Sequence, residues 1–109
     1  MELHNIPFGV TDWSVVTPTQ HPGEAGSASW RTRHFDAVRV RVVEYSAGYV
    51  ANHWCEKGHI LYCLTGDLRT ELADGRVFEL RPGMSYQVAD SAEPHRSSSL
   101  GGATLFIVD

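Results

Sequence analysis

The 109-residue sequence has only two cysteines and no long apolar run, and both shortages restrict what the protein can be. Two cysteines cannot supply the set of disulfides that stabilises a small secreted scaffold. No apolar segment approaches the ~20 residues that a membrane-spanning helix needs, so we expect no membrane partner. The first residues lack the basic start and apolar core of a signal peptide, which predicts a cytoplasmic protein with reduced thiols.

Positive charge is also scarce. Nine lysines and arginines stand against 13 aspartates and glutamates, and the basic residues form no cluster. A nucleic-acid-binding surface needs such a cluster because cations hold the phosphates, so we expect no nucleic-acid partner. Hydrophobic residues make up 42% of the chain and charged residues 20%. These proportions are typical of a single globular domain.

Short β-like segments separated by turns fill the chain from residue 30 onward, and no stretch shows a helical period. We predict strands at 13–16, 30–35, 38–42, 49–54, 60–64, 68–72, 76–80, 84–88, 96–100 and 104–108. The dipeptide Asp74-Gly75 is a strong signal for a tight hairpin. Residues 17–26 hold two prolines and two glycines and predict a long loop. This pattern is typical of an antiparallel sandwich or small barrel.

Three good metal ligands, His53, Cys55 and His59, lie within seven residues. On a strand, the side chains of His53 and Cys55 would point to the same face because they are two positions apart. A turn at Lys57-Gly58 would bring His59 back toward that pair, and His95 follows a second, proline-marked turn. Imidazole and thiolate suit zinc, iron, copper or nickel better than magnesium or calcium. The alternative is that these side chains only pack and hydrogen-bond.

These residues resemble the two sequence motifs of the cupin family. The first motif has a glycine, a His-x-His pair, a glutamate and a closing glycine. The matching residues here are Gly48, His53, Cys55, His59 and Gly66. The second motif resembles the segment from Pro82-Gly83 to His95, the remaining ligand. The match is closer still to the small bacterial DHCW-motif cupins, whose signature appears as Asn52-His53-Trp54-Cys55 with asparagine in place of aspartate.

The resemblance implies an all-β, single-domain cupin jelly-roll barrel at residues 30–109, preceded by an N-terminal arm and loop at residues 1–29. It implies a homodimer in which the arm packs on the partner. It also implies one divalent transition metal per chain, either zinc, iron or nickel, bound by His53, Cys55, His59 and His95. Further candidates for the pocket, or for orienting the ligands, are Asn52, Tyr49, Tyr86 and Arg96.

Three functions remain open at this point. The range of cupin chemistry suggests a metal-dependent oxygenase, isomerase or lyase acting on a small organic substrate. Cys55 and His59 replace the usual histidine and glutamate, however, so a non-catalytic module that binds a small ligand or a metal is an alternative. A barrel without metal is the third. Four protein ligands would close a zinc site, whereas three would leave a position open for water or substrate.

The surroundings of three further groups of side chains can also be predicted. Trp54 alternates with the ligands on either side of it, so we expect it to face away from the site. Arg39 and Arg41 share one strand face, which we interpret as a solvent-exposed face in preference to an anion-recognising site inside the barrel. Cys63 would lie ~13 Å below His59, too far for a disulfide with Cys55, and is therefore predicted to be a small core residue.

Overall fold

This computed structural model describes residues 2–109 of the chain. These residues contain ten β-strands and one short 3-10 helix. They are η1 (Trp13–Val15), β1 (Thr19–Pro22), β2 (Ser27–Phe35), β3 (Val38–Tyr45), β4 (Tyr49–Val50), β5 (His59–Gly66), β6 (Leu68–Leu72), β7 (Val77–Leu80), β8 (Ser85–Val88), β9 (His95–Ser99) and β10 (Ala103–Val108). Nearly all the strands predicted from residue 30 onward are confirmed, including the β6–β7 hairpin around Asp74-Gly75. No described helix is long and apolar enough to cross a membrane.

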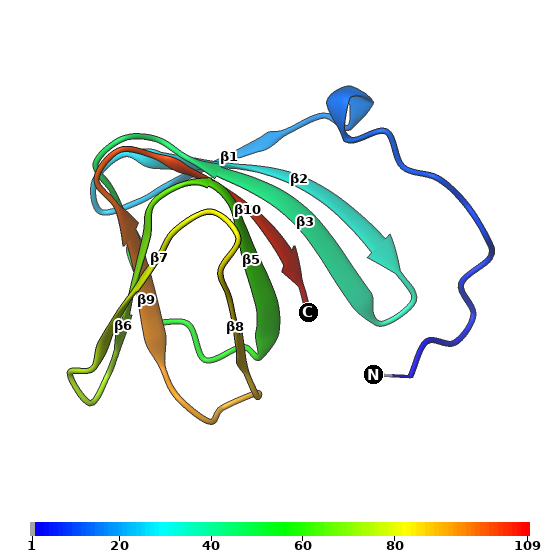
Figure 1. Cartoon of the computed structure of the whole chain (residues 1–109). Helices are drawn as coiled ribbons and strands as arrows, with labels where there is room; N and C mark the ends of the chain where they lie inside the picture. Colours follow the sequence, from blue (N-terminus) through cyan, green and yellow to red (C-terminus); the bar gives the residue numbers. More distant parts are fainter. Residues whose placement is uncertain (1) are drawn as a thin grey trace.

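The strands form two antiparallel sheets that face each other (Figure 1). One sheet has six strands in the order β1-β2-β3-β10-β5-β8, and the other has four in the order β4-β9-β6-β7. The non-consecutive neighbours in both sheets, with β10 returning between β3 and β5, are typical of a jelly roll. The predicted all-β jelly-roll class is therefore confirmed, as a two-sheet sandwich.

The core lies between the sheets because inward side chains alternate with outward ones along each strand. In β10, Ala103, Leu105 and Ile107 are buried while the residues between them are partly exposed. The core cluster also holds Ala28, Val43, Tyr49, Ala51, Leu61, Cys63, Leu68 and Leu80. Cys63 is fully buried and free, which confirms its assignment as a core residue.

The inward face of β3 is the opposite of the predicted one. Arg41 is only 6% exposed, and it lines the space between the sheets together with Arg39 and Val43. Asp109, at the end of β10, accepts hydrogen bonds from Arg39 at 2.8 and 2.9 Å and from Arg41 at 3.1 Å. The expectation of a solvent-exposed arginine face is therefore wrong. This buried carboxylate offsets one of the two positive charges and bonds both guanidinium groups, so the arginines can face inward.

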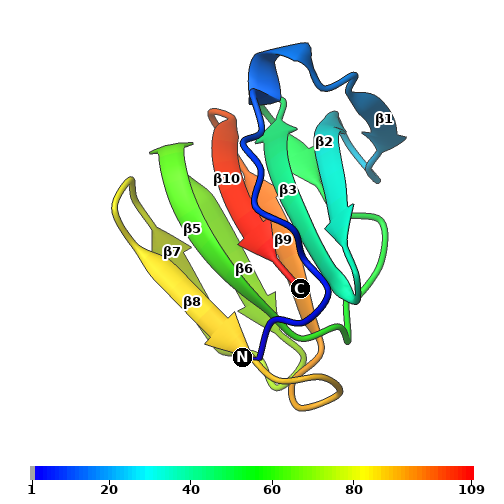
Figure 2. The same cartoon turned by 90° about the vertical axis from the view of Figure 1, so that its right-hand side faces the viewer.

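The N-terminal residues run along the outer face of the six-stranded sheet (Figure 2). Residues 13–15, predicted as a strand, form a 3-10 helix, because the Asp12 side chain caps it by accepting a hydrogen bond from Ser14 N at 3.0 Å. Trp13 packs edge-on against Phe106 with ring centroids 6.4 Å apart. The predicted loop at 17–26 contains β1, which pairs with β2. The division of the chain at residue 30 stays a prediction.

Two glycines with positive φ, Gly66 at the end of β5 and Gly75 between β6 and β7, provide a matched test of the packing. Gly66 has φ +81°, and a Cβ there would overlap the carbonyl oxygen of Gly102. Gly75 has φ +96° at a hairpin tip, with nothing within 4 Å of its Cβ position. We expect Gly75→Ala to lower the free energy of unfolding by about 1 kcal/mol, from backbone strain alone. Gly66→Ala should cost roughly 3 kcal/mol because the backbone must also shift. Urea denaturation measures both, and equal losses would contradict the overlap.

Candidate metal centre

The segment between β4 and β5 carries the thiol of the site, and it is not a strand. The strand predicted at 49–54 ends at Val50. Further along, Cys55 N donates a hydrogen bond to His95 O at 2.7 Å, and His95 N donates to Cys55 O at 3.0 Å. This isolated bridge joins Cys55 to the first residue of β9. It therefore brings a thiol and an imidazole from distant parts of the chain together.

After Cys55, the backbone at Gly58 crosses residues 89–90 at close range, and this chain crossing returns the backbone to the site. Gly58 N donates a hydrogen bond to the Asp90 side chain at 2.7 Å. A Cβ at Gly58 would lie 2.5 Å from Asp90 N and 2.7 Å from the carbonyl carbon of Ala89, so no side chain fits there. Directly after this crossing, His59 opens β5. The predicted turn at Lys57-Gly58 is thus held by the loop that follows β8.

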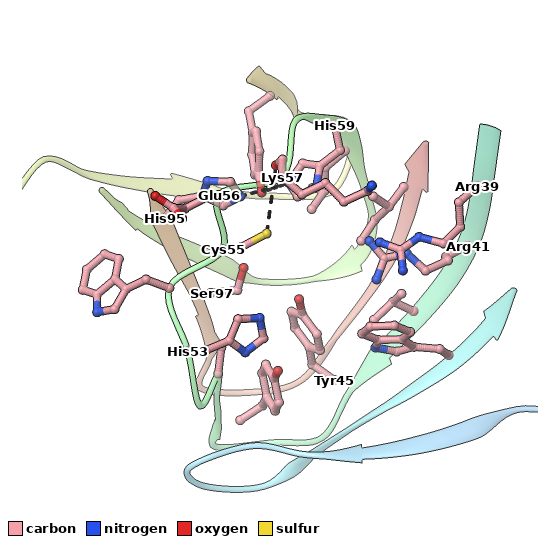
Figure 3. Close-up of a pocket in the computed structure, with 18 residues that line it drawn as sticks. Arg39, Arg41, Tyr45, His53, Cys55, Glu56, Lys57, His59, His95 and Ser97 are labelled. Atoms are coloured by element: carbon pink, nitrogen blue, oxygen red, sulfur yellow. Dashed lines mark hydrogen bonds between the residues drawn. The ribbon is translucent and has the colours of Figure 1, made fainter. Parts of the chain in front are cut away.

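The ligand atoms of Cys55, His59 and His95 all lie within 4.8 Å of one another (Figure 3). The Nε2 atoms of His59 and His95 are 3.1 Å apart. Two nitrogens bound to one tetrahedral zinc at ~2.0–2.1 Å would be separated by ~3.3 Å. His95 is only 2% exposed, and the group faces a cavity of about 360 Å³ between the sheets. The spacing of the three groups therefore fits a metal ion.

A hydrogen bond at His95 and a nearby carboxylate at His59 favour the histidine tautomers that a metal requires. His95 Nδ1 lies 2.8 Å from the carbonyl oxygen of Glu93, which can only accept, so Nδ1 carries the proton and the Nε2 lone pair faces the group. His59 Nδ1 is buried without a hydrogen-bond partner among the described residues, 3.8 Å from Asp109 Oδ2. That carboxylate favours a proton on Nδ1. The Nε2 lone pair of His59 then also points to the group.

The electrostatics of the three groups are coupled. The hydrogen bond with His95 lowers the pKa of the Cys55 thiol, and the same bond raises the pKa of His95. Burial, followed by the neighbouring charge of His95, lowers the pKa of His59 to about 4, so this imidazole is neutral at pH 7. A thiolate and a neutral imidazole are the forms that bind metal ions. The shifts of Cys55 and His59 thus favour the metal-binding forms, whereas the raised pKa of His95 means that this imidazole must lose a proton when a metal binds.

No protein-family model and no curated protein matches the sequence. Solved structures do match the fold. A predicted oxalate decarboxylase from Thermotoga maritima aligns with a TM-score of 0.78 and 17% identity, over 92% of this chain and 96% of that one. A sugar phosphate isomerase of the cupin superfamily from Silicibacter pomeroyi gives a TM-score of 0.70 and 16% identity, over 92% and 74%. The chain has the cupin fold.

A third solved structure with this fold is the polyketide cyclase RemF from Streptomyces resistomycificus. It aligns with a TM-score of 0.73 and 20% identity, over 94% of this chain and 78% of that one. At these identities the comparisons establish the fold, while the narrower resemblance to the DHCW-motif cupins stays a prediction.

The cupin fold places the fourth predicted ligand, His53, in the same cavity but outside the three-residue group. His53 Nδ1 is hydrogen-bonded to the Asn52 side-chain oxygen at 2.7 Å, so Asn52 orients this ring. Asn52 in turn donates to Pro22 O at 3.2 Å. Whether His53 ligates stays a prediction.

The remaining candidates take different positions around the cavity. Tyr86 OH lies 2.9 Å from His59 Nε2, and Tyr49 lines the cavity, stacked on Tyr45. Arg96 lies outside this cavity, with its guanidinium 5.1 Å from the Trp54 ring centroid. Trp54, expected to face away from the site, borders the cavity, but its ring packs against Arg96 and 41% of its surface is exposed. Its direction stays a prediction, and it does not follow from strand alternation because residues 51–54 are not a strand.

Two residues that shape this cavity, Arg41 and Asp109, were not among the site residues predicted from the sequence. Arg41 lines the cavity and Asp109 lies behind it, bonded to both arginines of β3. The alternation in 38–42 was a usable signal for Arg41, had the inward face been assigned correctly. Asp109 gives no local signal, since it contacts residues 68 and 70 positions away along the chain.

We predict that the Asp90 side chain holds the chain crossing that positions His59. Asp90→Ala should lower the free energy of unfolding by about 1 kcal/mol, and amide hydrogen exchange at Gly58 should accelerate because its acceptor is lost. Asp74→Ala is the control, since it removes a comparable bond to Arg76 N in an exposed hairpin. Unchanged exchange at Gly58 in Asp90→Ala, measured by NMR, would contradict this role.

Proposed function

We propose that this cupin binds one divalent transition metal ion per chain through Cys55, His59 and His95. The observation that carries the proposal is the 3.1 Å approach of the Nε2 atoms of His59 and His95, with the Cys55 thiol in the same group of ligand atoms within 4.8 Å of one another. A metal ion between them would bind all three donors. One thiolate and two imidazoles favour zinc, iron or nickel over magnesium or calcium.

His53 decides whether the proposed centre is open or closed. It lines the cavity, and its bond to Asn52 leaves Nε2 free to coordinate. Three ligands would leave a position open for water or substrate, whereas a fourth from His53 would close a tetrahedral site. Ligation by His53 would favour the non-catalytic candidate below and its absence the enzyme, and the His53 variant below distinguishes the two.

We further propose a metal-dependent enzyme of the oxygenase, isomerase or lyase type acting on a small organic substrate. A bound metal would polarise a substrate oxygen or activate water. The cavity of about 360 Å³ has the size of a small-molecule pocket, and Tyr86 presents its hydroxyl beside His59. Among the structural relatives, one is named as a cyclase and one as an isomerase.

A non-catalytic module that binds a metal or a small ligand is the second candidate function. It is favoured by the absence of a carboxylate from the three-residue group, because a carboxylate at the metal often serves as a general base. A closed site with four protein ligands would support this alternative.

The metal proposal predicts which variants lose the ion. Protein made without a histidine tag should bind about one zinc per chain. His95→Ala and His59→Ala should weaken zinc binding at least ~100-fold, since each removes a ligand. His34→Ala is the control, because this exposed histidine on β2 lies outside the cavity. Competition with a chromogenic chelator measures the affinities.

Two results of this experiment decide between the candidates. Equal zinc affinity in His95→Ala and His34→Ala would contradict the metal site. X-ray absorption of the zinc protein counts the ligands: one sulfur, two imidazoles and a water support the open centre. If a third imidazole disappears in His53→Ala, the site is closed and the enzyme proposal fails.

We also propose a cytoplasmic homodimer formed through the outer face of the six-stranded sheet. On β5, Ile60, Tyr62 and Leu64 alternate outward with exposures of 51%, 42% and 43%. In the N-terminal segment along this face, Phe8 is 97% exposed and Val10 86% exposed. Several large apolar side chains exposed on one sheet face and in the segment along it favour an interface, and two free thiols suit a reducing compartment.

The dimer proposal predicts that Leu64→Lys yields a monomer in sedimentation equilibrium, because a lysine in the interface would lose its hydration without a partner. Leu100→Lys should remain dimeric, since Leu100 is 89% exposed in the turn before β10, away from this face. A monomeric wild-type protein would contradict the proposal.

A further inference from the structure

The wall of the cavity formed by β3 carries a buried cation whose hydrogen bonds are incomplete. The guanidinium of Arg41 makes one hydrogen bond within the described residues, from Nη2 to Asp109 Oδ2 at 3.1 Å. Its Nε is closed off from the cavity and has no partner there, whereas Nη1 makes no hydrogen bond within the described residues and is not closed off. A guanidinium has five N–H donors, and an unpaired donor in a half-enclosed site is costly. Because Arg41 lines the cavity, it can offer the Nη donors to a ligand there.

The charge balance of this wall favours an anion. Arg39, Arg41 and Lys57 line the cavity, and the acidic side chain among the lining residues is Glu56. The Asp109 carboxylate lies behind the arginines with only 1% of its side chain exposed. Asp109 uses both oxygens on Arg39, so it compensates Arg41 only in part. A further negative charge in the cavity would be stabilised.

The guanidinium of Arg41 is also held in a fixed orientation. Its central carbon lies 4.4 Å from the ring centroid of Trp30. The Trp30 ring is in turn stacked on His21, with centroids 3.7 Å apart and planes inclined by 21°. A stacked, preorganised guanidinium loses little freedom when it binds a planar anion.

We propose that the cavity binds a small organic acid whose carboxylate is held by Arg41 and whose other end faces Cys55, His59 and His95 (Figure 3). The second half of this proposal rests on the proposed metal site, whereas the carboxylate site needs only the β3 wall. A planar carboxylate matches a single guanidinium with free donors. Phosphate would require donors around three oxygens, and Arg39 is already committed to Asp109.

Acetate titrated into metal-free protein tests the carboxylate site. The metal is removed with 1,10-phenanthroline, because a carboxylate chelator would itself compete. NMR follows the Nε–H signal of Arg41 and the indole N–H signal of Trp30. Acetate should shift both signals along a saturating curve. Acetamide, which has nearly the same shape but no charge, should leave them unchanged at the same concentration.

Variants locate the binding group. Arg41→Gln should weaken acetate binding at least tenfold, followed by the Trp30 signal. Lys57→Met, in an exposed turn, should weaken it a few-fold. Arg33→Met should have no effect, because Arg33 is exposed on β2 outside the cavity. If Arg41→Gln does not fold, the acetate–acetamide comparison and Lys57→Met still decide the question.

Several outcomes would overturn the inference. Equal shifts with acetate and acetamide, or unchanged acetate affinity in Arg41→Gln, would exclude a carboxylate site at Arg41. Inorganic phosphate binding tenfold more tightly than acetate would show that the ligand class is wrong. Because the titration uses metal-free protein, loss of zinc binding in the earlier experiment and loss of acetate binding here are separate failures.

Discussion

The buried carboxylate of Asp109 is the interaction on which the interior of this protein depends. It accepts hydrogen bonds from Arg39 and Arg41 and lies 3.8 Å from His59 Nδ1, so it contacts both sides of the cavity. Two arginines could not face the interior of a small β-sandwich without such a partner, because an unpaired buried charge is strongly destabilising. The hydrogen bonds from Arg39 keep the pKa of Asp109 low despite its burial.

This arrangement gives the cavity two chemically different sides. Thiol and imidazole groups lie where the segment before β5 meets β9, and cations lie along β3. The two sides draw on residues far apart in the sequence, and β10 joins them because it pairs with both β3 and β5. The apolar side chains of Val43, Leu61 and Ile107 line the cavity together with these polar groups. Because the two sides of the cavity differ in this way, a bound molecule with two different ends would be oriented in one direction.

Most of the fold and three of the proposed ligands could be predicted from local patterns. Alternation and turn residues located the strands, and motif spacing located Cys55, His59 and His95, which the structure brings together. Alternation of period two separates two faces but does not say which one is inside, so the inward face of β3 was misassigned. The bridge from Cys55 to His95 depends on tertiary contacts, and for that reason residues 51–54 were wrongly expected to continue a strand.

The two departures from the usual cupin motif preserve the charge of the proposed ligand set. In the motif, two neutral histidines precede an anionic glutamate. In this chain the anionic donor to a bound metal would be the Cys55 thiolate, whose formation the lowered pKa of this thiol favours, while position 59 carries a neutral imidazole. The negative charge has therefore moved from a hard oxygen to a soft sulfur, which favours zinc and other thiophilic metals over manganese or magnesium. The carboxylate that position 59 lacks is supplied behind the ring by Asp109, where it can orient the imidazole without occupying a coordination position.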